Sequence, residues 1–230
     1  MASNKFNYLR AYQVMDTDFA RRQMVQQQVR TWDVADPSVL AVLAELHRER
    51  FVPPEFEDLA FADTAIPLPH KQMMMTPIVE GRLLQALELK PQHYVLEIGT
   101  GTGFLTACLA NLSAAVTSVD IFSDFISMAE ANLADAQIEN TELICMDATK
   151  DLPKGQFDAI AVTGSLPVFD TRFVDALKPG GRMFVIVGDS PVMDARIVIR
   201  IGDNDWTTKS LFETDVRPLL NASRPSAFSF

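Results

Sequence analysis

The sequence predicts an α/β protein built on a doubly wound, mostly parallel β-sheet. From Tyr94 onward, short apolar segments that suit buried strands alternate with longer segments that suit helices. A glycine cluster directly follows the first of these strands, as expected where a strand turns sharply into a helix. Near the end of the chain, Arg196–Ile201 and much of Lys209–Thr214 alternate apolar and polar residues around a turn at Asp203-Asn204. This last pattern predicts a C-terminal antiparallel hairpin.

Residues 1–75 are expected to form an N-terminal helical and loop extension that packs on the sheet domain. A first helix is expected to run from near Asp16 to about Val29, with apolar residues so thinly spread that it needs a packing partner. A second helix is predicted to begin with Asp36 as its N-cap and a proline in its first turn. Pro53-Pro54 then excludes helix at that point and opens a loop.

Residues 76–230 are expected to form one compact Rossmann-like domain with helices on both faces of the sheet. Thr76-Pro77 repeats the N-cap and first-turn signal, so a helix is predicted to start there. The other segments follow from hydrophobic pattern and turn residues. The expected strands are Tyr94–Ile98, Ala115–Val119, Glu142–Met146, Phe157–Val162 and Arg182–Val187, and the expected helices are Phe104–Leu112, Ser123–Ala136 (with Ser123 as cap) and a short one around Phe173–Leu177.

The composition is that of an acidic globular chain. Of 230 residues, 48% are hydrophobic and 22% are charged, which excludes wholesale disorder. The formal net charge of −10 repels a phosphate backbone, so we expect no nucleic-acid partner. Two cysteines are too few for a disulfide scaffold or a zinc cluster, so we expect no metal site and a reducing, cytoplasmic location. We expect no membrane segment, because no apolar run approaches 18 residues.

The strongest chemical signal is the segment Val95–Gly103, which carries three glycines in the spacing G-x-G-x-G. Glycines let the backbone approach a ligand closely, and the following helix presents its N-terminal amides to that ligand. Asp120 and Asp147 end the next two expected strands. A carboxylate at the end of the second strand suits the two hydroxyls of a ribose, and one at the third suits an adenine amino group. Together these features predict a nucleoside-binding site.

The glycine spacing differs from the G-x-G-x-x-G of dinucleotide sites, and Glu97 stands two residues before the first glycine. This pattern resembles motif I of the class I methyltransferases that bind S-adenosylmethionine. Phe157–Ile160 and Leu177–Arg182 are similar to later segments of that superfamily. The resemblance implies S-adenosyl-L-methionine as cofactor and S-adenosyl-L-homocysteine as product. The implied cofactor-binding residues are Glu97, Gly99, Thr100, Gly101, Thr102, Gly103, Asp120, Ile121, Asp147 and Ala148.

The N-terminal region sharpens the resemblance. Arg22–Arg30, Arg48–Pro53, Leu59–Asp63 and Ile66–Leu68 resemble, in this order, segments of the protein-L-isoaspartate O-methyltransferases. The resemblance covers nearly the whole chain. It implies methylation of the free α-carboxylate of isoaspartyl residues in damaged proteins, a protein or peptide substrate, and an extension that covers the acceptor site. Since a carboxylate is already ionised at pH 7, this chemistry needs positioning and exclusion of water more than an acid or base.

The chain departs from the family pattern at the expected acceptor site. His70, Gln72 and the proline that follows Thr76 fit a family stretch that carries a serine beside the substrate carboxylate, but Met75 stands in place of that serine. A thioether cannot donate a hydrogen bond to a carboxylate. The residues expected near the acceptor are His70, Gln72, Met75, Thr76, Thr163 and Ser165, the last with a turn role as an equal alternative. No catalytic residue is assigned beyond these.

Two further readings of the sequence stay open. Met75 favours a methyltransferase that acts on a different acceptor, either a small molecule or another protein group. A non-catalytic protein that keeps S-adenosylmethionine as a sensed or structural ligand would retain the glycines and Asp120 and lack an acceptor site. The sequence does not indicate an oligomeric state, nor a role for residues 1–15 or for the tail after Pro218.

Overall fold

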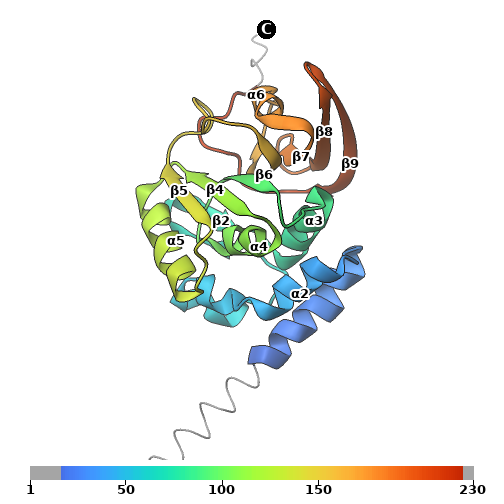
Figure 1. Ribbon diagram of the computed structural model, residues 1–230. Coiled ribbons are helices and arrows are strands. Elements are labelled where there is room, and N and C mark those ends of the chain that lie inside the picture. The colour runs from blue at the N-terminus through green and yellow to red at the C-terminus, as the bar shows by residue number, and fades with distance from the viewer. Residues whose placement is uncertain (1–16, 225–230) are drawn as a thin grey trace, which may run out of the picture.

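The fold described here is that of a computed structural model, which describes residues 17–224. Asp16, residues 1–15 and the last six residues of the tail therefore lie outside the described residues. A seven-stranded sheet with the order β5-β4-β3-β6-β7-β8-β9 forms the centre of the molecule (Figure 1). Its strands are β3 (Tyr94–Ile98), β4 (Ala115–Asp120), β5 (Thr141–Cys145), β6 (Phe157–Leu166), β7 (Leu177–Val187), β8 (Met193–Gly202) and β9 (Asp205–Thr214).

The first five of these strands pair in parallel, and β8 and β9 add to the sheet in antiparallel fashion. The order reverses at β3, since the chain moves outward through β4 and β5 and then returns to place β6 on the other side of β3. Ligands of such sheets bind outside the carboxyl ends of the strands at this point of reversal. The predicted α/β class, the mostly parallel sheet and the C-terminal hairpin are confirmed.

The two faces of the sheet belong to two hydrophobic clusters, because successive side chains of a strand point to opposite sides. In β3, Val95 packs with the helices α3 (Pro77–Leu87) and α4 (Phe104–Leu112), whereas Leu96 and Ile98 pack on the opposite face. That second face is covered by the short α6 (Arg172–Asp175) and by apolar residues near the C-terminal end, including Leu219. Its helical cover is thus much thinner than that of the first face, as Figure 1 shows.

The helix caps follow the predicted chemistry in two of three cases. Asp36 accepts hydrogen bonds from the amides of Ser38 and Val39 at the start of α2 (Pro37–Glu45), and Thr76 accepts one from Val79 at the start of α3. The predicted Ser123 cap is wrong. Helix α5 (Ser123–Asp135) begins at that serine, with Phe122 at the N-cap position and no side-chain cap.

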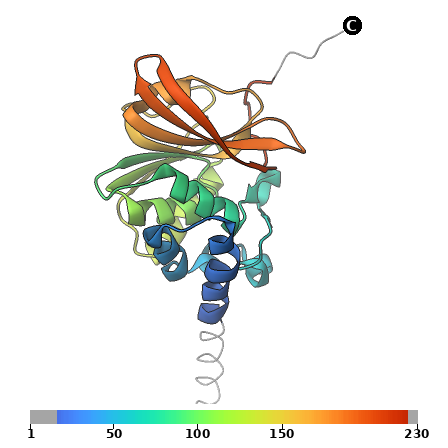
Figure 2. The ribbon, with the colours of Figure 1, turned by 90° about the vertical axis from the view of Figure 1, so that its right-hand side faces the viewer.

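The N-terminal extension lies against α3 and α4, on the side of the molecule opposite the β8–β9 hairpin (Figure 2). Residues 17–23 are α-helical and continue as a π-helix, η1 (Met24–Val29), and a 3₁₀ turn, η2 (Arg30–Trp32). The region that was expected to be loop after Pro53 contains a 3₁₀ helix, which a proline can start because its missing amide is unneeded there. The remaining short elements are η3 (Arg48–Phe51), η4 (Pro54–Leu59), β1 (Ile66–Pro67), η5 (Pro69–Lys71) and β2 (Met73–Met74).

A buried ion pair joins the extension to the sheet domain. The Arg48 side chain is fully buried and bonds to the Glu80 carboxylate on α3. It also donates to the carbonyls of Ala60 (2.9 Å) and Met75 (2.8 Å). The pair therefore fixes the position of the segment that leads into β2 and α3. Among residues 17–224, no helix has the length and apolar character needed to cross a membrane.

Candidate functional site

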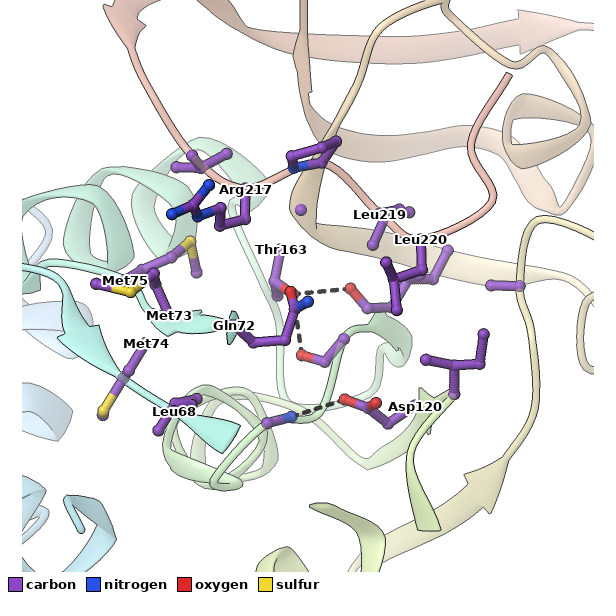
Figure 3. A pocket seen from close by; sticks show the side chains of 18 of the residues that line it. Leu68, Gln72, Met73, Met74, Met75, Asp120, Thr163, Arg217, Leu219 and Leu220 are labelled. Atoms are coloured by element: carbon purple, nitrogen blue, oxygen red, sulfur yellow. Dashed lines mark hydrogen bonds between the residues drawn. The ribbon is translucent and has the colours of Figure 1, made fainter. Parts of the chain in front are cut away.

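A pocket of about 660 Å³ opens at the carboxyl ends of β3, β4 and β6 (Figure 3). Its size suits a small-molecule ligand. Part of its lining comes from the glycine loop after β3, the loops after β4 and β5, and the acceptor segment before α3, which comprises residues 72–76. Further lining comes from the end of β6, the β7–β8 connection and the C-terminal segment. The pocket lies at the reversal of strand order, where the fold is expected to bind its ligand.

The glycine loop passes close under this pocket. Gly99, Gly101 and Gly103 all have positive φ, at 100°, 53° and 85°. An added Cβ at Gly99 would lie 2.1 Å from the Thr163 hydroxyl oxygen, so a side chain there is excluded on two grounds. Thr163 itself donates to the carbonyls of Ile98 and Gly99, each at 2.9 Å. The loop therefore presents backbone without side chains to the pocket at its glycines.

Asp120 lines the pocket at the end of β4. One carboxylate oxygen accepts a hydrogen bond from the Gly101 amide (3.0 Å), and the other accepts one from the Phe122 amide (3.0 Å). Burial raises the pKa of Asp120, and backbone hydrogen bonds from Gly101 and Phe122 partly offset this effect. Each carboxylate oxygen can accept more than one hydrogen bond, so the group holds the loop and still has acceptor capacity for a ligand.

Asp147, Ala148 and Ile121 also line the pocket. Burial opposes ionisation of Asp147, but hydrogen bonds from Thr149, Asn221 and Lys150 outweigh it and lower its pKa to about 2. This carboxylate is therefore charged at neutral pH and is held in place by its neighbours. Its orientation is fixed partly by Asn221, a residue from the C-terminal tail (2.9 Å).

Glu97 lies beside the glycine loop and is not among the residues that line the pocket. Its side chain is fully buried and accepts hydrogen bonds from Ser118 (2.5 Å) and Thr106. Thr100 and Thr102 are buried too, and neither they nor Gly103 lines the pocket. Glu97 and Thr100 both bond to Ser118, which ties the loop to β4. Desolvation by burial raises the pKa of Glu97 to about 8, against the opposing effect of the two hydroxyls.

This raised pKa predicts how stability depends on pH. Below pH 4.5 both the folded and the unfolded chain hold the Glu97 proton; between 4.5 and about 8 only the folded chain does, so ionisation favours unfolding as the pH rises. The effect is at most on the order of 5 kcal/mol. Glu97→Gln removes the titration, so the melting temperature of the variant relative to native protein is expected to rise steadily from pH 5 to pH 8. Thermal unfolding followed by circular dichroism checks this, and a constant difference across that range would contradict it.

The acceptor segment contributes Gln72, Met73, Met74, Met75 and Thr76 to the pocket. Figure 3 shows Gln72 between the methionines and Thr163. The short antiparallel pairing of β1 with β2 holds this segment, and Arg48 fixes the Met75 carbonyl. Thr76 uses its hydroxyl oxygen to cap α3 (3.4 Å). Among the predicted acceptor residues, Gln72, Met75, Thr76 and Thr163 are therefore brought together.

His70 and Ser165, which were also expected near the acceptor, are not among the residues that line the pocket. His70 stacks on Phe122 with ring centroids 3.8 Å apart, and its Nε2 lies 2.8 Å from the Asp124 carboxylate. These contacts tie the residues just before the acceptor segment to Phe122 in the loop after β4 and to the first turn of α5. Ser165 is fully buried and donates its hydroxyl to the Val216 carbonyl (3.2 Å). Its role is to hold another segment of backbone in place.

Sequence reasoning missed a whole wall of the pocket. Asp189, Ser190 and Met193 line it from the connection between β7 and β8, and residues 214–220 together with Arg224 line it from the C-terminal segment. The tail has no regular hydrophobic periodicity, so no pattern marked it as part of the site. The segment after β9 returns across the sheet to the end of β6, where Ser165 and Pro218 form a parallel bridge, and this tertiary contact places it in the site.

The sheet order, the bare glycine loop and the pocket-facing Asp120 define a class I methyltransferase fold with a site for S-adenosylmethionine. The residues present fit that cofactor, because Gly99 and Gly101 present bare backbone to the pocket and Asp120 retains acceptor capacity toward it. A model of the family described as protein-L-isoaspartate(D-aspartate) O-methyltransferase matches residues 20–222. The chain belongs to this family.

Individual relatives agree with that assignment. The chain is 35% identical over 183 residues to a protein-L-isoaspartate O-methyltransferase of Methanoregula boonei, covering 79% of this chain and 84% of the relative. It is 31% identical over 233 residues to protein-L-isoaspartate O-methyltransferase 1 of Rhodopseudomonas palustris, covering 91% and 92%. A crystal structure of a putative family member from Plasmodium falciparum, in complex with S-adenosyl-L-homocysteine, superposes with a TM-score of 0.74 at 18% identity, covering 86% of this chain and 97% of that one. That likeness supports the fold.

Proposed function

We propose that this protein is an S-adenosylmethionine-dependent methyltransferase that methylates the free α-carboxylate of isoaspartyl residues in damaged proteins or peptides. The observation that carries the proposal is a family match over residues 20–222 combined with a pocket at the reversal of strand order. The alignments with two relatives span 84% and 92% of those proteins, and both are named protein-L-isoaspartate O-methyltransferases. The resulting ester can collapse to a succinimide, which hydrolyses in part to normal aspartate.

The cofactor is proposed to lie along the glycine loop, with its ribose hydroxyls on Asp120 and its adenine near Asp147 and Ala148. Support comes from the bare backbone at Gly99 and Gly101 and from the loops after β4 and β5, which line the same pocket. Glu97, Thr100 and Thr102 are proposed to stabilise the loop from beneath. When bound, S-adenosylmethionine supplies a sulfonium methyl group, and a carboxylate oxygen forms the new C–O bond while the C–S electron pair returns to sulfur.

The chain's own part in this chemistry is positioning. The acceptor carboxylate is ionised at neutral pH and needs no general base. Residues 1–75 are proposed to cover the acceptor side, where Gln72 and the three methionines exclude water and set the approach of the peptide. The methionines offer an adaptable apolar lining, which suits a substrate whose neighbouring side chains vary. Rate is then gained through proximity and desolvation.

Asp120→Asn is expected to weaken binding of S-adenosylhomocysteine by about 10- to 100-fold, because a charged acceptor is lost. Burial raises the pKa of Asp120, so this carboxylate takes up its proton at a higher pH than an exposed aspartate does. The affinity of the native protein for S-adenosylhomocysteine is therefore expected to begin falling at that higher pH on acidification. Calorimetric titration of S-adenosylhomocysteine across pH checks both effects. Asp135→Asn is the matched control, because Asp135 is an exposed aspartate at the end of α5 that does not line the pocket. Equal affinities of native and Asp120→Asn protein would contradict the assignment.

Methyl transfer from labelled S-adenosylmethionine to an isoaspartyl peptide and to its normal aspartyl twin tests the proposed function. Transfer to the isoaspartyl peptide alone is the expected result. Binding of S-adenosylhomocysteine is measured in the same preparation to show that the protein is folded. No transfer by protein that binds the product would overturn the isoaspartyl reading.

A second candidate function keeps the methyltransferase and changes its acceptor to a small molecule or another protein group. Met75, which lines the pocket without a hydrogen-bond donor, is the observation that favours it. Met75→Ser discriminates between the two. If the variant gains isoaspartyl activity that the native protein lacks, the native acceptor is a different one; if native protein is already active, the methionine does not disable the site.

We also propose a cytoplasmic location, supported by two cysteines that are both unpaired.

A further inference from the structure

The C-terminal strap, residues 214–220, returns to the pocket along the end of β6. Ser165 anchors it through its backbone: its amide donates to the Arg217 carbonyl (3.0 Å), and its carbonyl accepts from the Leu219 amide (2.9 Å). Ser165 and Pro218 form a parallel bridge. Since Ser165 is fully buried, these bonds hold the main chain of the strap against the end of β6, next to the pocket.

Arg217 is the residue of the strap whose charged group is available to a ligand. Its side chain lines the pocket, and within residues 17–224 its guanidinium has no hydrogen-bond or ion-pair partner. Arg217 is exposed at the mouth of the pocket, whereas the buried Arg48 and Arg200 both bond to backbone carbonyls. Figure 3 shows Arg217 on the same side of the pocket as Met73 and Met75, with Asp120 on the other side.

The acceptor side of the pocket has few donors for an anion. Met75 has none, and the Thr163 hydroxyl is used by the carbonyls of Ile98 and Gly99. The acidic residues that line the pocket are Asp120, Asp147, Asp189 and Asp215, and the positive charges among the described lining residues are those of Arg217 and Arg224. An incoming carboxylate therefore needs a cation, and Arg217 lies where the acceptor is proposed to enter.

We propose that Arg217 binds the carboxylate of the methyl acceptor and thereby replaces the serine hydroxyl that the family resemblance implies at Met75. The inference rests on the proposed function. A guanidinium matches a carboxylate in geometry and charge, and such bonds are stronger than those from a neutral hydroxyl. Arg217 is thus a binding and specificity residue that selects acceptors with a free carboxylate.

This role predicts a particular kinetic signature. The carboxylate loses its negative charge as the ester forms, so Arg217 holds the acid more tightly than the transition state or the neutral ester. An interaction that is strongest with the ground state governs KM more than kcat. Arg217 also lets the product leave, because the ester no longer pairs with the guanidinium.

The test uses Arg217→Gln in the full-length protein. KM for an isoaspartyl peptide is expected to rise by about 10- to 100-fold, with kcat changed by less than about threefold. Calorimetry on protein saturated with S-adenosylhomocysteine gives a second readout: native protein is expected to bind the isoaspartyl peptide more tightly than its α-carboxamide twin, and Arg217→Gln to bind both equally. Arg217→Lys, which keeps the charge, is expected to recover part of the preference. Arg30→Gln, an exposed arginine of the N-terminal extension, is the control and keeps native values.

The possible outcomes distinguish a failure of the proposed role of Arg217 from a failure of the proposed isoaspartyl methyltransferase function. Native activity with an unchanged KM in Arg217→Gln overturns the assignment of Arg217 and leaves the function standing. A rise in KM for Arg224→Gln that equals the rise for Arg217→Gln also overturns it, since general charge would then explain the effect. No transfer by native protein overturns both. Rescue of Arg217→Gln by the added change Met75→Ser would further support the inference, because a serine would restore a donor to the same carboxylate.

Discussion

Arg48→Met is expected to lower the free energy of unfolding by about 3–5 kcal/mol, because it leaves the Glu80 carboxylate buried without its partner. Arg48 also satisfies the carbonyls of Ala60 and Met75, and its guanidinium lies 4.8 Å from the centre of the Phe104 ring. In a chain of this size, a loss of this magnitude corresponds to about 10 °C in melting temperature. Thermal and urea unfolding of native and variant protein measure it.

The double variant Arg48→Met with Glu80→Leu separates the electrostatic part of this effect from the geometric part. Replacing both members of a buried pair by apolar residues is often neutral for stability, so much of the lost stability is expected to return. The Met75 carbonyl lacks its donor in both variants, so KM for the acceptor is expected to be raised in Arg48→Met and in the double variant alike. A double variant as unstable as Arg48→Met would contradict the view that the unpaired Glu80 charge causes the loss.

Gly99→Ala is expected to destabilise the protein by about 2–4 kcal/mol and to abolish measurable binding of S-adenosylhomocysteine. The new Cβ would stand 2.1 Å from the Thr163 hydroxyl, in a backbone conformation with φ near 100° that alanine rarely adopts. The glycine loop must move to relieve the clash and the backbone strain, and this movement displaces the backbone that is proposed to hold the cofactor. Thermal unfolding and calorimetry with S-adenosylhomocysteine measure the two effects.

Gly180 provides the matched control for this variant. It also has positive φ, at 80°, but an added Cβ would meet nothing within 4 Å. Gly180→Ala is therefore expected to cost only the backbone strain, about 1–2 kcal/mol, and to leave binding of S-adenosylhomocysteine unchanged. If Gly99→Ala were no more harmful than Gly180→Ala, the close packing of the loop on Thr163 would not matter.

The central strands could be predicted from the sequence because their signals are local. The predicted boundaries are correct for β3 (Tyr94–Ile98) and α4 (Phe104–Leu112). The apolar strand ends at glycines, which can adopt the positive φ that the turn between the two elements needs. The Asp36 and Thr76 caps were predictable for the same reason. Strand β7 begins earlier than predicted, at Leu177, because pairing with β6 carries the Pro-Gly-Gly segment into the sheet with a register shift.

The strand pattern pointed to the pocket residues that follow a strand, and the family resemblance added Gln72, Met75, Thr76 and Thr163. Asp120 and Asp147 line the pocket because the carboxyl ends of parallel strands share one edge. The complete burial of Glu97 could not be predicted from the sequence, because it depends on packing of β3 against Thr106 of α4 and Ser118 of β4. Arg217 could not be found from sequence, since its position depends on backbone bonds to Ser165, more than 50 residues earlier in the chain.

The most direct test of the account is the location of the transferred methyl group. An isoaspartyl peptide with an additional side-chain carboxylate is incubated with the protein and S-adenosylmethionine, and the product is fragmented in a mass spectrometer. The account predicts a single methyl ester on the isoaspartyl α-carboxylate, followed by loss of methanol as the succinimide forms. Methylation of the other carboxylate, or of a nitrogen or hydroxyl group, would contradict it.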